Sequence, residues 1–290
     1  MSHSKKLIVN ADGFGFGSGA TQGILDAIRE GRFISSVSVN ANFPEAERVR
    51  DLLSEFPEIS IGVHLNPMAG KPCLPAEKVP SLVGDDGCML NHRFPRLLRQ
   101  GAISLSELEA ELDAQIGRMK SLAGDRLTHI DSQGNEHLAY FDLFLKLAKR
   151  WKIPRMRNNA SLICLEAPNA KRSRLQVYSC KPHVWAAHRY RRHQMQKARA
   201  AGMRMADRLV TVGYAGVGNK GNPDNWRRLL RNLPSGTYEI YCHPAYPDDT
   251  LRDWSVYYEE RAQELALLRD KELCAVAREA GVEIVSFNAI

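Results

Sequence analysis

Residues able to bind a metal ion or to transfer a proton recur at the ends of short apolar runs in this sequence. Three histidines and two aspartates stand in such positions, and imidazole and carboxylate groups are natural protein ligands of divalent ions. His129 and Asp131 are two residues apart, so on a strand they project from the same face. A lone histidine at a strand end is usually structural, but four such positions in one chain favour a metal site. The polar residues at these positions are Asn10, Asp12, His64, His129, Asp131 and His243.

A glycine-rich turn beside Asp12 offers a different interpretation. The segment GFGSGA, residues 15–20, matches the dinucleotide-binding pattern G-x-G-x-x-A between a predicted strand and a predicted helix. However, the next predicted strand is followed by Ala41, Asn42 and Phe43, with no acidic residue to bind a ribose hydroxyl. Asp12 also precedes the turn, where it would repel a pyrophosphate. The glycines are better explained by the backbone freedom of a tight turn that forms part of a site.

The elements that must position these residues alternate between strands and helices. This alternation predicts a mostly parallel sheet covered by helices, either a barrel or a doubly wound sheet. Both folds carry their sites at the carboxyl ends of the strands. Helices are expected near 20–30, near 105–119, where a capping box at Ser104 and Glu107 precedes the apolar positions, and near 258–280. Strands are expected at 7–10, 35–40, 59–65, 127–131, 238–242 and 282–287, with weaker candidates at 154–157 and 209–212.

Length and composition fit one domain of α/β-barrel size or two small ones, and we predict a single domain over residues 1–290 with one unusual segment. The chain is 44% hydrophobic, enough for a full core, and no apolar run approaches the ~20 residues of a membrane span. Residues 168–216 break the alternation and are predicted to be an insertion. Within it, Lys171 to Arg204 contains ten Lys or Arg and no Asp or Glu. The six cysteines form no CxxC pair and no signal-peptide core is evident, which predicts a cytoplasmic protein.

Four motifs in order resemble the YdjC-like carbohydrate deacetylases, the family of chitooligosaccharide deacetylase and the hopanoid-biosynthesis deacetylases. They are IVNADGFGFGSG near the start, IGVHLN around His64, THIDSQGNEH at 128–137 and YCHPAYPD at 241–248. The resemblance implies an irregular (β/α) barrel, similar to a TIM barrel and here carrying a basic helical insertion, and one divalent ion, zinc or magnesium. It also implies that His64 and His129 are metal ligands with Asp12 close by, and that His243 matches the family's CHP histidine.

Two positions depart from the family pattern. The strand-one motif usually reads Asp-Asp, and Gly13 replaces the second Asp. A further histidine usually follows THxDS, where this chain has Gln133. In the related NodB-type deacetylases the second Asp binds the metal and the first acts as base. These departures keep a catalytically impaired sugar-binding homologue open as an alternative.

The function predicted is metal-dependent hydrolysis of an N-acetyl or other N-acyl group on an amino sugar. In this interpretation Asp12 is the base as well as a metal neighbour, and His243 protonates the departing amine or stabilises the oxyanion. Asp131 would orient a ligand histidine, and Asn10 and His137 would support the site or contact the substrate. A glycoside hydrolase would need two facing carboxylates, for which only Asp12 and Asp131 are available. A metal phosphoesterase usually needs more carboxylates than the strand ends supply.

The basic segment suggests a partner that the motifs do not. One interpretation is a solvated helical lid. The other is a surface that binds anionic lipid, or the phosphates of a lipid-linked sugar, through charges that contribute on the order of 1 kcal/mol each. Trp185 and Tyr190, which interleave with these charges, suit the lipid headgroup region. This second interpretation places the enzyme at the inner face of the cytoplasmic membrane. No RNA-binding motif accompanies the segment, so no nucleic-acid partner is expected, and the sequence leaves the oligomeric state open.

Overall fold

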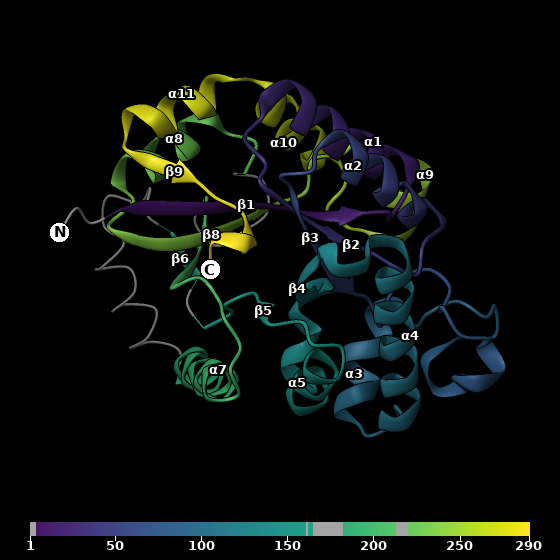
Figure 1. Cartoon of the computed structure of the whole chain (residues 1–290). Coiled ribbons are helices and arrows are strands. Elements are labelled where there is room, and N and C mark those ends of the chain that lie inside the picture. The colour runs from purple at the N-terminus through teal and green to yellow at the C-terminus, as the bar shows by residue number, and fades with distance from the viewer. Residues whose placement is uncertain (1–3, 161, 165–181, 213–219) are drawn as a thin grey trace.

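The sheet of the computed structural model consists of parallel strands, as the alternation predicted. The structure describes residues 4–160, 162–164, 182–212 and 220–290. The strand order is β5-β4-β3-β2-β1-β8-β7-β6, and β9 pairs with the start of β1 beside β2 (Figure 1). The strands are β1 (Lys5–Phe14), β2 (Ser36–Val39), β3 (Ser60–Leu65), β4 (Leu127–Ser132), β5 (Arg155–Met156), β6 (Leu162–Cys164), β7 (Arg208–Thr211), β8 (Gly236–Cys242) and β9 (Val282–Ile284).

The strand at the centre of this order, β1, carries the first of the predicted site residues. Its side chains are buried from Leu7 to Phe14, as expected for a strand covered on both faces. It pairs with β8 up to Ala11 and with β2 from Asn10, so Asp12 lies opposite Ser38 in the register. The ends of β1, β2, β3, β4 and β8 therefore meet at one edge, where the predicted site residues stand.

The helices pack around the sheet (Figure 1). The predicted capping box is partly present, because the Ser104 hydroxyl accepts from the Glu107 N–H and α4 begins at the next residue. The single helix expected over 258–280 is instead two helices, α10 and α11, separated where Asp270 adopts an extended conformation and accepts from the Glu272 N–H. The helices are α1 (Ser18–Asp26), α2 (Val49–Glu55), α3 (Phe94–Arg99), α4 (Leu105–Ala123), α5 (Phe141–Arg150), α7 (Pro182–Ala200), α8 (Pro223–Asn232), α9 (Asp249–Trp254), α10 (Glu259–Arg269) and α11 (Glu272–Glu279).

The outer strands come together through the segment before β7. Arg155 of β5 forms a parallel bridge with Arg204, and the backbone N–H groups of Met156 and Arg204 donate to Arg204 and Pro154 at 3.0 and 2.8 Å. This bridge joins β5 to the chain that leads into β7, so the sheet curls round on itself. The fold is the irregular (β/α) barrel that the sequence predicted.

The basic segment contributes the helix α7. Met195 and Ala198 are buried, and the Gln194 amide donates to the Leu138 carbonyl at 2.8 Å, so one side of the helix packs on the barrel. Trp185 and Tyr190 are exposed by 49% and 55%. The rest of the predicted insertion, residues 168–181 and 213–216, lies outside the described residues. In the part of the chain that the structure describes, no helix is long and apolar enough to cross a membrane.

Two histidines are built into the interior of the barrel. His137 shares a 2.7 Å hydrogen bond with the Ser132 hydroxyl through Nδ1, and its ring lies 4.5 Å from that of Phe144. His129 stacks on Phe287 at 3.8 Å. Burial lowers the pKa of each histidine from 6.5 to about 3, so both are neutral at pH 7.

We predict that His137 makes the fold sensitive to acid. Because its pKa in the folded protein lies below its unfolded value, the unfolded chain binds the extra proton. The stability from this group is therefore present above pH 6.5 and is lost as the pH falls toward 3, at roughly 1.4 kcal/mol per pH unit. His137→Phe should reduce the slope of the unfolding free energy against pH between pH 6 and 4. The reduction should correspond to about one bound proton, and urea denaturation at each pH measures it.

The exposed His92 provides the control for this experiment. His92→Phe removes an exposed histidine instead of a buried one. The unfolding free energy of this variant should depend on pH as steeply as that of the wild type. Equal slopes for the wild type and His137→Phe would contradict the prediction.

Candidate active site

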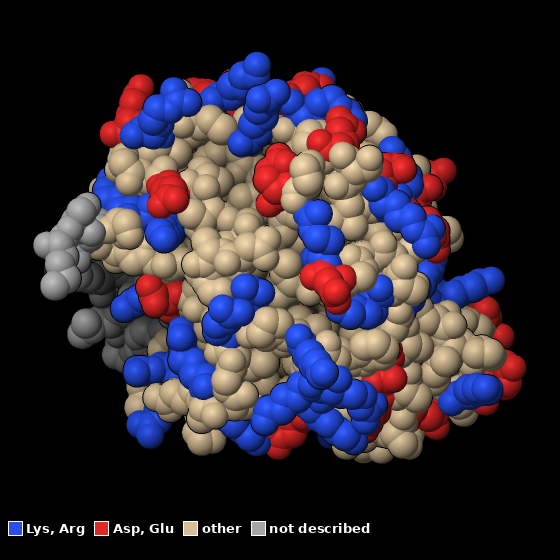
Figure 2. Space-filling view, in the orientation of Figure 1, with Lys and Arg blue, Asp and Glu red and all other residues tan. Residues whose placement is uncertain are grey.

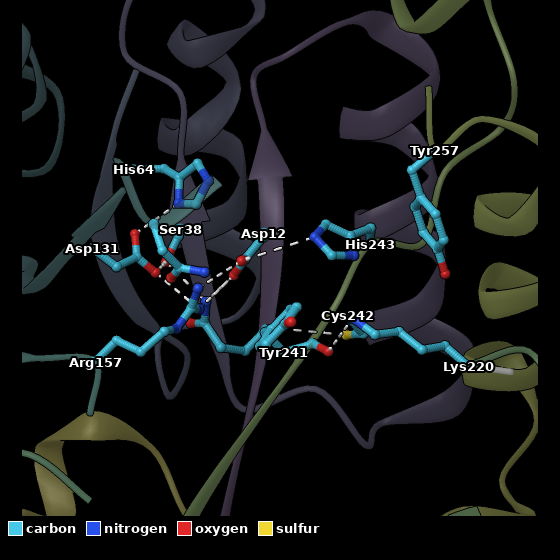
Figure 3. Close-up of polar contacts among 12 residues, drawn as sticks. Asp12, Ser38, His64, Asp131, Arg157, Lys220, Tyr241, Cys242, His243 and Tyr257 are labelled. Atoms are coloured by element: carbon cyan, nitrogen blue, oxygen red, sulfur yellow. Dashed lines mark hydrogen bonds and ion pairs between the residues drawn. The ribbon is translucent and has the colours of Figure 1, made fainter. Parts of the chain in front are cut away.

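A cavity of about 260 Å³ opens at the carboxyl ends of the central strands. Five of the predicted or flagged positions line it: Asp12, Gly13, His64, Gln133 and His243. Figure 3 shows Asp12 between two groups of side chains, with His64, Asp131 and Arg157 to one side and His243 and Tyr257 to the other. The full lining is Asp12, Gly13, Phe16, His64, Ser132, Gln133, Gly134, Asn135, Arg157, Tyr241, His243, Ser255, Tyr257 and Arg261.

The Asp12 carboxylate forms a bidentate pair with Arg157. The two terminal nitrogens of the guanidinium donate to Oδ1 and Oδ2 at 2.7 and 2.8 Å, and both side chains are at least 95% buried. Asn10 donates a further hydrogen bond to Oδ1 at 2.6 Å, which is the supporting position predicted for it. Burial alone would raise the pKa of Asp12, but Arg157 outweighs it and holds that pKa well below its ordinary value. Asp12 is therefore ionised at every working pH.

Arg157 also binds two other buried carboxylates. Its Nη2 lies 2.9 Å from Oδ2 of Asp131, and its Nε donates to Glu239 at 2.6 Å. Burial raises the pKa of Glu239 to about 7 despite this contact. One guanidinium thus faces Asp12, Asp131 and a partly protonated Glu239. With His64 in the neutral form that a metal ligand requires, negative charge remains in excess.

His64 and Asp131 form a second buried pair. Nδ1 of His64 lies 2.7 Å from Oδ1 of Asp131, the aspartate for which the sequence analysis predicted an orienting role. Burial lowers the pKa of His64, but Asp131 and Asp12 outweigh that effect and raise it above its ordinary value.

Asp12, His64 and Asp131 together fit a divalent ion. Each residue offers a ligand atom, these atoms lie within 4.8 Å of one another, and all three side chains are buried. Two carboxylates and one imidazole are an accepted donor set for divalent ions. The excess negative charge around Arg157 is a second reason for the fit, since a buried charge is normally compensated. Arg157 is at the same time a competing cation, because it occupies both oxygens of Asp12.

His129 lies outside this group of ligand atoms. Nδ1 lies 2.8 Å from the Thr128 hydroxyl and Nε2 lies 3.2 Å from the Ser38 hydroxyl, and a Cβ on Gly62 would lie 2.3 Å from Nε2. His129 and Asp131 do share one face of β4, because both contact the Ser38 hydroxyl. Asp131 takes the position in the group that the sequence analysis gave to His129. His137 lies deeper still, bonded to Ser132.

His243 stands on the far side of Asp12 and is fixed by helix α10. Its Nε2 lies 4.0 Å from Oδ2 of Asp12. Its backbone N–H donates to Glu264 at 2.8 Å, and the Tyr257 hydroxyl binds the same carboxylate. Burial, with the nearby positive charge of Lys220, lowers the pKa of His243 to about 4. The imidazole is therefore neutral at pH 7.

Sequence reasoning did not identify several charged or polar residues around the pocket. They belong to no motif, and their local signals were weak. Arg157 ended a weak strand candidate, and Glu239 was an acidic residue within an apolar strand. Lys220, the residues of α10 and Tyr257 just before that helix had no signal. These residues are Arg157, Lys220, Glu239, Tyr257, Arg261 and Glu264.

Comparison with known proteins agrees with this architecture. The model of the YdjC-like protein family matches residues 6–279. A protein named carbohydrate deacetylase from Geobacillus stearothermophilus is 31% identical over 290 residues, covering 97% of this chain and 96% of its own, and one of that name from Thermoanaerobacter pseudethanolicus is 27% identical with 99% of each chain covered. A crystal structure from Enterococcus faecalis, provisionally described as a cellobiose-phosphate cleavage protein, superposes with a TM-score of 0.75 at 27% identity, covering 99% of this chain and 98% of its own. This chain is a member of the YdjC-like family.

Proposed function

We propose that this protein is a metal-dependent hydrolase that removes an N-acyl group, most simply acetyl, from an amino sugar. The observation that carries the proposal is a single cavity that joins a buried group of metal-ligand atoms to a neutral histidine. The substrate class rests on the relatives, which are named carbohydrate deacetylases. Release of a free amine from an N-acetylated sugar tests it directly.

Asp12, His64 and Asp131 would hold the ion, zinc or magnesium. When bound, such an ion activates water and polarises the amide carbonyl. The contact between Oδ1 of Asp131 and Nδ1 of His64 holds two of these ligand groups together. His129 would support this arrangement through Ser38 from the layer below.

The pKa values favour His243 over Asp12 as the residue that receives a proton. Asp12 is ionised but weakly basic, since Arg157 holds its pKa low. His243 is neutral and lies in the cavity, so it can accept a proton from water and later donate it to the departing amine. Asp12, 4.0 Å away, would stabilise the imidazolium formed between these two steps.

The geometry argues against the glycosidase alternative. A pair of glycosidase carboxylates must face each other across the bond to be cleaved. Asp12 and Asp131 instead contact the same guanidinium nitrogen, at 2.7 and 2.9 Å, and of the two only Asp12 lines the cavity.

We predict that Arg157 weakens metal binding. Arg157→Gln should raise the affinity for Zn²⁺ or Mg²⁺ at least about tenfold, because a unit charge about 4 Å away contributes up to roughly 4 kcal/mol near a protein surface. Without the ion, the same variant should be about 3–5 kcal/mol less stable, since buried carboxylates lose their partner. Titration calorimetry and thermal denaturation with and without metal measure the two effects.

Arg155→Gln is the matched control for this variant. Arg155 lies two residues away on β5, and its guanidinium donates to the carbonyl of Ile290 rather than to the site. The Arg155→Gln variant should bind the metal ion with the affinity of the wild type. An Arg157→Gln protein that is folded and binds metal no more tightly than the wild type would refute the competition.

We predict that two substitutions separate metal binding from proton transfer. His243→Gln should lower turnover roughly 10²- to 10⁴-fold while metal content stays at the wild-type level. Asp12→Asn should lower turnover and metal content together, because Asp12 is a ligand here. Amine release and elemental analysis of the same samples provide the readout. A fully active His243→Gln protein would remove His243 from the mechanism, and an Asp12→Asn protein with full metal content and no turnover would restore Asp12 as the base.

We further propose that α7 attaches the protein to an anionic membrane surface, at the cytoplasmic face. The support is a basic helix that exposes two aromatic residues, Trp185 and Tyr190. Figure 2 shows basic side chains at the lower left, where Figure 1 places α7. Its exposed cations include Arg189, Arg191, Arg192, Lys197 and Arg199.

Co-sedimentation with vesicles measures this attachment. We expect binding to vesicles containing phosphatidylglycerol at low salt and release at high salt, because exposed charges are screened. Replacing Arg191 and Arg192 by Gln should weaken binding. Replacing the exposed Lys271 and Arg278 at α11, which Figure 1 shows at the other end of the molecule from α7, should not. Equal sedimentation with and without anionic lipid would contradict the proposal.

A further inference from the structure

A fully buried asparagine in the barrel has a side chain without hydrogen bonds. Asn40 directly follows β2 and is 0% exposed, yet neither Nδ2 nor Oδ1 of its carboxamide is hydrogen-bonded to a described residue. Among the described residues, it is the only one with two buried side-chain atoms in this condition. Buried amides in native proteins almost always have a partner, because removing them from water without one is unfavourable. Asn40 can therefore bind a group that the chain does not supply.

The direction of the Asn40 side chain follows from the alternation along β2. The residues on either side of Ser38 are valines that belong to the main hydrophobic core. Ser38 itself faces the barrel interior, where its hydroxyl donates to Asp131 at 2.9 Å (Figure 3). The strand pairing continues to Asn40, whose backbone N–H donates to the Phe14 carbonyl at 2.8 Å. Because side chains two residues apart on an extended chain lie on the same face, Asn40 also faces the interior.

The sheet register puts Asn40 level with a candidate metal ligand. Val39 pairs with Val63 of β3 in parallel register. The residues that follow them, Asn40 and His64, therefore lie side by side, on strands about 4.8 Å apart. His64 in turn pairs with Asp131 of β4. Asn40 thus extends the row that supplies two of the three candidate ligands.

The candidate ligands are also too few to complete the coordination of an ion. Asp12, His64 and Asp131 offer one ligand atom each, whereas zinc usually takes about four ligands and magnesium about six. A carbonyl oxygen is a natural ligand of magnesium, calcium and manganese. An amide is neutral, so it adds an oxygen without adding to carboxylates that already repel one another.

We propose that Asn40 is a further ligand of this ion and binds it through Oδ1. The inference rests on the metal-dependent function proposed above. An ion of the magnesium type retains several water molecules, and one of these can accept from Nδ2, so that the bound ion satisfies both atoms of the amide. A buried water without an ion is the competing explanation, and metal affinity separates the two.

The affinity for metal, measured without any substrate, tests the proposal. Asn40→Leu replaces the carboxamide by an apolar group of similar shape, and the purified protein is titrated calorimetrically with Mg²⁺ and with Zn²⁺. We expect the affinity to fall at least about tenfold, the lower limit for residues that support a metal site. The metal-free variant should melt at or above the temperature of the metal-free wild type, because an unpaired buried amide does not stabilise the fold. A residue that only supports the fold would lower that temperature.

Asn42→Leu is the matched control, two residues further along the chain. Asn42 is also buried, but its amide is fully used within the fold. Its Nδ2 donates to the carbonyls of Ala69 and Lys71 at 2.8 and 2.9 Å, and its Oδ1 accepts from Asn66 at 3.0 Å. The Asn42→Leu variant should therefore melt several degrees below the wild type and bind metal with the affinity of the wild type.

Asn40→Ala removes the amide without adding a branched side chain, and it gives the same two readings if the leucine variant does not fold. Unchanged metal affinity in a folded Asn40 variant would overturn the proposal in favour of a buried water. Loss of folding in both variants would overturn it too, because the amide would then be satisfied within the fold.

Amine release from N-acetylated sugars is measured separately on the same proteins. A wild type that binds metal through Asn40 but releases no amine contradicts the proposed function alone. A wild type that releases amine and binds metal no more tightly than Asn40→Leu contradicts the ligand assignment alone. A wild type that binds neither ion contradicts both.

Discussion

The buried guanidinium of Arg157 is the contact on which the rest of the site depends. It joins carboxylates from β1, β4 and β8, three strands that reach the same edge of the sheet from distant parts of the chain. Three buried carboxylates without it would repel one another in a medium of low polarity, and removing one partner of a buried ion pair typically costs about 3–5 kcal/mol. The same contact fixes Asp12 in its ionised form. Arg157 therefore both stabilises the barrel edge and sets the electrostatics of the cavity.

This arrangement divides the cavity into two ends. Around Asp12, one arginine faces more than one full negative charge, so the surplus suits a cation. Around His243, burial and Lys220 keep the imidazole neutral while Arg261 remains without an acceptor among the described residues. A sugar amide lying between these ends would face the metal-ligand carboxylates on one side and the neutral imidazole on the other, and this difference can orient the substrate.

The sequence predicted the strands other than β6, their parallel arrangement and the polar residues at their ends, because each of these signals was local. Alternation also placed His129 and Asp131 on one face of β4 correctly. It did not show which of the two joins the ligand group: Asp131 contributes a ligand atom beside Asp12 and His64, whereas the ring of His129 stacks on Phe287. Arg157 and Arg261 could not be found in this way. Their roles depend on which distant carboxylates the fold brings to them, and a single arginine in a sequence has no local mark of that.

The helix α10 positions the cavity side chains on the His243 side. Glu264 and Arg261 are three residues apart, so they project from the same face of the helix. Glu264 fixes the backbone of His243 and binds Tyr257, while Arg261 extends toward Gly13. A shift of α10 would therefore move His243 and Arg261 together. Because Arg157 holds Asp12 and Asp131 independently, a change confined to α10 can alter the surroundings of His243 without disturbing the group of metal-ligand atoms.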